Sequence, residues 1–205
     1  MGPFELSGLR FGLSDHAMSR LLPVLFALTA GFYFAVCQVG YFVQLQFHLS
    51  STFVSYYTTI GVWLLGALLG LFVRAKGIEV WMVVTGLGAY YAQGLVLQQH
   101  PYDLRWLPFY LLFIFVTACY SGYFFRQARA AFSSVKSLFF HENNGFLLGY
   151  FVALTQLLLE GQTSQQVLPA IGAVGHLGSL ILLRVGWAGR PAPAAPRTSG
   201  GTGAQ

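Results

Sequence analysis

The chain has 205 residues, of which 56% are hydrophobic and only 8% are charged. Soluble domains carry roughly 25% charged residues, so this composition excludes an ordinary water-soluble enzyme and indicates an integral membrane protein. The net charge of +5 does not indicate nucleic-acid binding, because the basic residues are divided among short segments instead of clustering on one solvated surface.

Six apolar stretches are long enough to cross a bilayer, at about 21–47, 53–73, 77–97, 106–125, 145–162 and 167–186. Each is predicted to be helical, because lipid offers no partner for unpaired backbone groups. The fold class is therefore all-α, with a six-helix transmembrane domain over 21–187. The N-terminal segment 1–20 and the tail 188–205, which is predicted to be disordered, flank this domain.

Of the eleven basic residues, all except Arg105 fall on one side of this layout. Basic residues near span ends are retained in the cytoplasm, which predicts that both termini are cytoplasmic. The acidic Glu5 and Asp15 precede the first apolar run, and that run is too long for a signal peptide. These features predict an uncleaved first span and favour a bacterial inner membrane. Arg105 and Asp103 are expected to form a local ion pair.

The predicted cytoplasmic segment 126–144 is the longest connection. Phe132, Val135 and Phe139 recur there at helical spacing, which fits either an amphipathic helix on the inner leaflet or an extension of the fourth span. The polar run at 141–144 is expected to cap the fifth helix through Asn143 or Asn144. A cytoplasmic partner would dock on the basic and polar residues of this face, namely Arg126, Arg129, Lys136, His141 and Glu142.

Glycines at spacings of three or four are typical of helix packing in lipid. The predicted packing positions are Gly66, Gly70, Gly145, Gly149, Gly172, Gly175 and Gly178. Cys37 and Cys119 lie inside predicted spans and are expected to pack as small apolar groups.

Several segments resemble the membrane domain of multi-spanning spermidine synthase-like proteins. They are residues 38–70 (QVGYFVQLQFHLSSTFVSYYTTIGVWLLGALLG), LFVRAKG at 71–77, SGYFFRQAR at 121–129 and HENNGFLLGYFVAL at 141–154. The chain departs from the family pattern at Glu142, where asparagine is expected. The resemblance implies a fold like half of a major facilitator transporter. It implies no aminopropyl transfer, because no soluble synthase domain follows the last span in this sequence.

His176 lies near the middle of the sixth span, and ionisable residues at that depth are candidates for function. Two interpretations remain open, a functional histidine or a neutral one that donates to a carbonyl group or to Gln38. The candidates for a ligand site or polar interior are His176, Gln38, Gln93, Gln156 and Glu160. Gln44 and Gln46 at the end of the first span could join Gln156 and Glu160, together with Asp103 and Arg105, in a polar vestibule at the outer edge.

No cofactor is predicted, and no residue spacing indicates a metal site. Haem b bound by His48 and His100 at the outer edge is the weaker alternative. The sequence offers no nucleophile with a nearby base, which argues against an enzyme. We therefore expect a non-catalytic membrane subunit or anchor that packs against lipid or partner membrane proteins, including further copies of itself. The alternatives are a half-transporter that acts as a dimer, or a haem-, quinone- or pigment-associated subunit.

Overall fold

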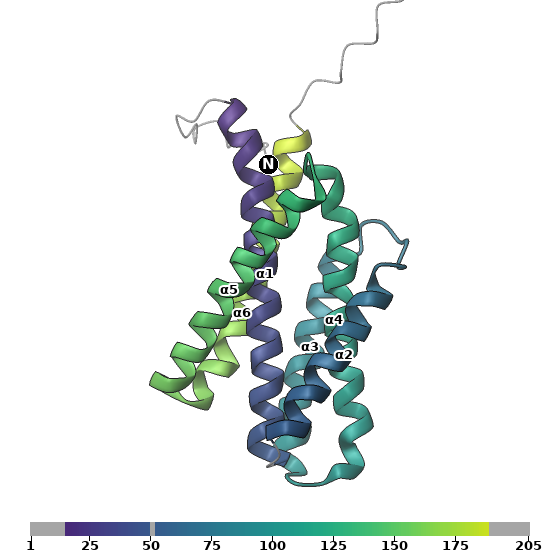
Figure 1. The fold of residues 1–205 in the computed structure, drawn as a ribbon, viewed down its shortest axis with the longest axis vertical. Coiled ribbons are helices and arrows are strands. Elements are labelled where there is room, and N and C mark those ends of the chain that lie inside the picture. Colours follow the sequence, from purple (N-terminus) through teal and green to yellow (C-terminus); the bar gives the residue numbers. More distant parts are fainter. Residues whose placement is uncertain (1–14, 50–51, 189–205) are drawn as a thin grey trace, which may run out of the picture.

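The structure is a computed structural model that describes residues 15–49 and 52–188 (Figure 1). These residues form six α-helices and two short 3-10 helices, with no β-strand among them. The α-helices are α1 (Asp15–Leu49), α2 (Thr52–Gly70), α3 (Glu79–Gln99), α4 (Leu107–Ala128), α5 (Val135–Glu160) and α6 (Gln162–Ala188). The 3-10 helices are η1 (Leu104–Trp106) and η2 (Arg129–Ala131). The all-α prediction is confirmed, whereas the segment 1–14 and residues 189–205 of the predicted tail lie outside the described residues.

Four helical segments are long and apolar enough to cross a membrane. They are Arg20–Leu49, Glu79–Gln99, Leu104–Ala131 and Gln162–Val185. The helices α2 and α5 are not in this group, and α5 carries the polar run 141–144 within its first half.

The start of α5 differs from the sequence prediction. Ser134 is its N-cap, since its side-chain oxygen accepts a hydrogen bond from the Ser137 backbone N–H at 3.1 Å. The polar run 141–144 therefore lies inside the helix, and the prediction that Asn143 or Asn144 caps it was wrong. The segment 126–144 is divided between two helices: the fourth apolar segment extends through η2 to Ala131, and α5 begins at Val135. Phe139 then folds back and stacks on Phe125 with ring centroids 4.5 Å apart.

A single residue, Gly161, separates α5 from α6, whereas the predicted spans 145–162 and 167–186 left residues 163–166 between them. Gly161 has φ 64°, a left-handed conformation that glycine adopts without a steric penalty. The chain reverses there at once, so Gln162, Gln165 and Gln166 lie on the first turns of α6 and not in a loop.

The long helix α1 packs mainly on α5 and α6, while α4 packs mainly on α2 and α3. Figure 1 shows the start of α1, the end of α6 and the connection from α4 to α5 at the same end of the bundle. The chain thus reverses direction from one helix to the next.

The crossing of α1 with α5 and the crossing of α2 with α4 have glycines at equivalent positions. A side chain on Gly31 of α1 would overlap the backbone carbonyl of Glu142 in α5, and one on Gly145 would overlap the carbonyl of Leu28. In the second crossing, Gly122 of α4 meets the carbonyl of Ala67, and Gly70 of α2 meets the carbonyl of Cys119. Helix pairs α1–α5 and α4–α2 therefore use the same pattern of small residues, which is typical of close helix packing in membranes.

Candidate functional site

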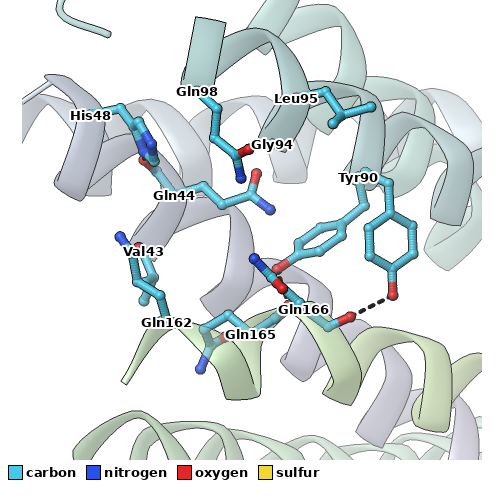
Figure 2. A pocket seen from close by; sticks show the side chains of 11 residues that line it. Val43, Gln44, His48, Tyr90, Gly94, Leu95, Gln98, Gln162, Gln165 and Gln166 are labelled. Atoms are coloured by element: carbon cyan, nitrogen blue, oxygen red, sulfur yellow. Dashed lines mark hydrogen bonds between the residues drawn. The ribbon is translucent and has the colours of Figure 1, made fainter. Parts of the chain in front are cut away.

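A pocket of about 400 Å³ opens at the end of the bundle where α1 and α3 end and α6 begins. We call it the glutamine pocket, because Gln44, Gln98, Gln162, Gln165 and Gln166 all line it. Figure 2 shows these amide side chains reaching toward one space from three helices. The remaining lining residues are Val43, His48, Tyr90, Tyr91, Gly94 and Leu95, so no acidic residue, lysine or arginine contributes to the pocket.

Two tyrosines clamp α3 to the first turns of α6. The Tyr90 hydroxyl donates to the Gln165 carbonyl, and the Tyr91 hydroxyl donates to the Gln166 carbonyl, both at 2.6 Å. Gln165 is 3% exposed, and its Nε2 donates to the carbonyl of Ala153 at 3.2 Å. Its Oε1 is buried without a hydrogen-bond partner among the described residues, as is the Oε1 of Gln44.

Below this pocket, hydroxyl groups bridge α1, α3 and α4. The Tyr41 ring packs edge-on against Tyr90, with centroids 5.0 Å apart, and its hydroxyl lies 2.6 Å from the Thr117 hydroxyl. Thr117 in turn lies within hydrogen-bonding distance of the Gly86 carbonyl, at 3.0 Å. These contacts connect the three helices beside Tyr90, which lines the glutamine pocket.

His176 is fully buried in a second polar layer, and three helices meet at it. Its Nε2 lies 2.6 Å from the Tyr120 hydroxyl of α4, and its Nδ1 lies 3.3 Å from the Thr29 hydroxyl of α1. Thr29 lies 2.7 Å from the Ser179 hydroxyl, and the imidazole stacks on Phe26. The expected partner, Gln38, is not bonded to His176. Instead, Gln38 lines a separate cavity of about 350 Å³ between α1, α2 and α5.

A third cavity, of about 340 Å³, lies on the other side of this layer and is lined by Tyr120. Glu79 of α3 and Arg184 of α6 also line it and form an ion pair at 2.7 Å, the only one within the described part of the chain. Sequence reasoning missed this pair, because the two residues are far apart in the chain and each lies at a helix end where a charge usually meets water.

The remaining polar candidates do not gather at one site. Gln93 is fully buried in α3, and neither atom of its amide group has a hydrogen-bond partner among the described residues. Gln156 is partly buried and Glu160 is exposed on α5, and neither lines the glutamine pocket. The prediction of an ion pair between Asp103 and Arg105 was wrong, because their side chains form no ion pair. Instead, the Asp103 side chain caps η1 by accepting a hydrogen bond from the Arg105 backbone N–H at 3.0 Å.

The predicted docking residues are divided between surface and interior. Arg126, Arg129 and Lys136 are exposed, and His141 is partly buried. Glu142 is only 5% exposed and faces inward, so it does not contribute to an exposed surface. The Arg126 guanidinium donates to the Val73 carbonyl and the Arg129 guanidinium to the Phe132 carbonyl, which ties these side chains to the ends of neighbouring segments.

Two of the predicted packing glycines behave differently from the rest. Gly66, Gly70, Gly145, Gly149 and Gly172 lie against neighbouring helices. Gly175 and Gly178 face open space, as does Gly88 of α3.

His48 and His100 each have a partner of their own. The Nδ1 of His48 lies 2.8 Å from the Gln44 carbonyl, and His100 stacks on Trp106 with ring centroids 4.8 Å apart. Within the described residues, no group of three or more His, Cys, Asp or Glu side chains is placed to hold a metal ion. Haem binding by the two histidines stays a prediction. Cys37 is buried and Cys119 partly buried, and neither forms a disulfide.

Comparison with protein-family models, with curated proteins and with solved structures gives no match for this chain.

Proposed function

We propose that this protein is a non-catalytic integral membrane subunit that crosses a bacterial inner membrane six times and binds partner membrane helices, with both termini in the cytoplasm. The alternation of helix direction supports an even number of crossings, since the start of α1 and the end of α6 lie at one end of the bundle. The exposed basic residues Arg74, Lys76 and Arg126 lie toward that end, as the positive-inside rule requires of a cytoplasmic face.

Exposed glycines on α3 and α6 carry the proposal. We use the name glycine face for the exposed positions Gly88, Gly175 and Gly178 of these two helices. Gly88 and Gly175 are each nine residues from one partner of the ion pair between Glu79 and Arg184, so they lie at a similar level on antiparallel helices. Nine residues are about two and a half helical turns, so each glycine lies on the side of its helix away from the ion pair. Apart from its chain neighbours and the nearby backbone of its own helix, a Cβ placed at any of the three glycines meets no atom within 4 Å. Exposed small residues let a partner helix approach the backbone closely.

The buried polar groups support a binding role over a catalytic one. Both ring nitrogens of His176 are engaged by hydroxyl groups inside the bundle, and the residue has no exposed surface. A general acid or base needs access to its substrate, which this arrangement denies to His176.

Purification in a mild detergent tests the proposal, and the expected result is a partner membrane protein, or a second copy of the chain, in fixed stoichiometry. Gly88→Leu and Gly175→Leu should each release the partner, because they fill the glycine face. The matched control is Gly61→Leu, whose side chain also enters open space but on α2. A monomer without a partner, or equal loss of the partner from all three variants, would contradict the proposal.

A half-transporter is the second candidate, favoured by the placement of two cavities. The glutamine pocket and the cavity beside Glu79 and Arg184 both involve α1, α3 and α6, and the layers of Tyr41 and His176 lie between them. Binding near the middle of the membrane, with access from alternate sides, is how many transporters work. Solute uptake into proteoliposomes that is lost in His176→Ala would support this function, and retention of uptake by that variant would contradict it.

A further inference from the structure

We propose that the glutamine pocket binds a small, neutral, polyhydroxylated molecule of the size of a monosaccharide or polyol. The site goes beyond the proposed subunit function, because it lies at the end of the bundle and contains no residue of the glycine face. Its volume of about 400 Å³ falls within the range of small-molecule sites, roughly 300–1,000 Å³.

The absence of charge in the lining selects a neutral ligand. None of the pocket residues is acidic, lysine or arginine, and the only titratable groups are His48 and two tyrosines. A bound cation or anion would lose its hydration without gaining an opposite charge, which is costly in a buried site.

The fixed hydrogen bonds leave two buried acceptors without partners in the pocket. Gln165 donates through Nε2 to the Ala153 carbonyl, which fixes its amide orientation and leaves Oε1 as an unpaired buried acceptor. The Tyr90 hydroxyl donates its one hydrogen to the Gln165 carbonyl, so toward the pocket it can only accept a hydrogen bond. The Oε1 of Gln44 is also buried without a hydrogen-bond partner among the described residues.

The Tyr91 hydroxyl and the His48 imidazole provide two further acceptors in the pocket. The Tyr91 hydroxyl donates to the Gln166 carbonyl, so only its lone pairs are free. The Nδ1 of His48 lies against the Gln44 carbonyl at 2.8 Å and must carry the proton to bond it, which leaves Nε2 as an acceptor. Buried acceptors without partners are costly, and a ligand that supplies O–H donors removes the cost. A quinone offers only acceptors and leaves the buried acceptors of Gln44 and Gln165 unpaired, whereas a hydroxyl group can donate to them and can also accept from the glutamine amides of the lining.

Gly94 provides the means to test the site. A Cβ at Gly94 would lie 3.4 Å from the Gln44 amide nitrogen, so a small side chain is tolerated while a long one fills the pocket. Gly88 lies on the same helix, and a Cβ there meets nothing within 4 Å. Gly94→Leu should therefore block the ligand, and Gly88→Leu should not.

The experiment measures binding of glucose, myo-inositol and glycerol to the full chain in detergent by calorimetry. At least one of them should bind, and Gly94→Leu should abolish that binding. Gln44→Met, which removes one acceptor, should weaken it about tenfold. Gly88→Leu should keep the ligand even where it loses the protein partner, so failure of this proposal and failure of the subunit proposal are distinguishable.

Permethylated forms of the same compounds and a short-chain quinone serve as ligand controls, because they keep acceptors but lack O–H donors. Neither should bind. The proposal is overturned if none of the three polyols binds, if a permethylated form or the quinone binds as tightly as the parent polyol, or if folded Gly94→Leu protein retains full affinity.

Discussion

The imidazole Nε2 of His176 lies 2.6 Å from the phenolic oxygen of Tyr120, and this contact joins α6 to α4 in the interior of the bundle. Thr29 adds α1 to the same cluster through the other ring nitrogen. Three helices that are distant in sequence are thus connected by one side chain. The histidine that stood out in the sequence is placed to hold the bundle together.

Removal of the Tyr120 hydroxyl should destabilise the protein. In Tyr120→Phe, the buried Nε2 of His176 loses its partner, and we expect the free energy of unfolding in detergent to fall by about 1 kcal/mol. The matched control is Tyr110→Phe, because the Tyr110 hydroxyl is buried without a partner among the described residues. That variant should be neutral or more stable. Equal stability losses in both variants would show that the contact with His176 contributes nothing specific.

Gly122→Ala should disrupt the crossing of α4 and α2. The added methyl group would overlap the Ala67 carbonyl, so the helices must separate, at a cost of about 1–3 kcal/mol. Gly61→Ala places the same methyl group in open space and should gain up to about 1 kcal/mol from helix propensity. Thermal unfolding of the two variants beside the wild type measures both effects, and a Gly122→Ala protein as stable as Gly61→Ala would refute the close crossing.

The sequence predicted the helices better than their contacts. Apolar length located all six α-helices, because the requirement for internal backbone hydrogen bonds acts locally. It could not place the start of α5, since Ser134 and the aromatic contact between Phe139 and Phe125 depend on tertiary structure. It singled out His176 but missed Tyr120, since nothing in local spacing distinguishes this tyrosine from its aromatic neighbours. The glutamine pocket was missed because Gly161 brings Gln165 into a helix where a loop was expected.

Glu142→Gln should stabilise the protein at alkaline pH. The Glu142 carboxylate is buried in α5, and no ion pair joins it to another described residue. An unpaired buried charge is costly, and we expect the neutral amide to gain about 1–2 kcal/mol. Protonation also removes the charge, so the advantage of the variant should shrink as the pH falls. Thermal melts across pH check this, with Glu160→Gln as the exposed control that should show no gain. A variant less stable than wild type at every pH would point to a partner for the carboxylate.

Labelling with a membrane-impermeant maleimide in intact cells tests the six-span arrangement. In a chain whose two native cysteines are replaced, Leu104→Cys and Thr163→Cys should react from outside, because these exposed residues follow α3 and α5. Lys76→Cys and Ser133→Cys should react only after the membrane is permeabilised. The reverse pattern would invert the topology, and labelling of all four from outside would rule out membrane crossing by these helices.

Photo-crosslinking in native membranes tests the partner-binding role most directly. A photoreactive residue at Val174, which is 70% exposed beside Gly175, should give one discrete protein adduct. The same residue at Leu158 of α5, which is 86% exposed, should react with lipid alone. The absence of a protein adduct at Val174, or the same adducts from both positions, would contradict a binding role for the glycine face.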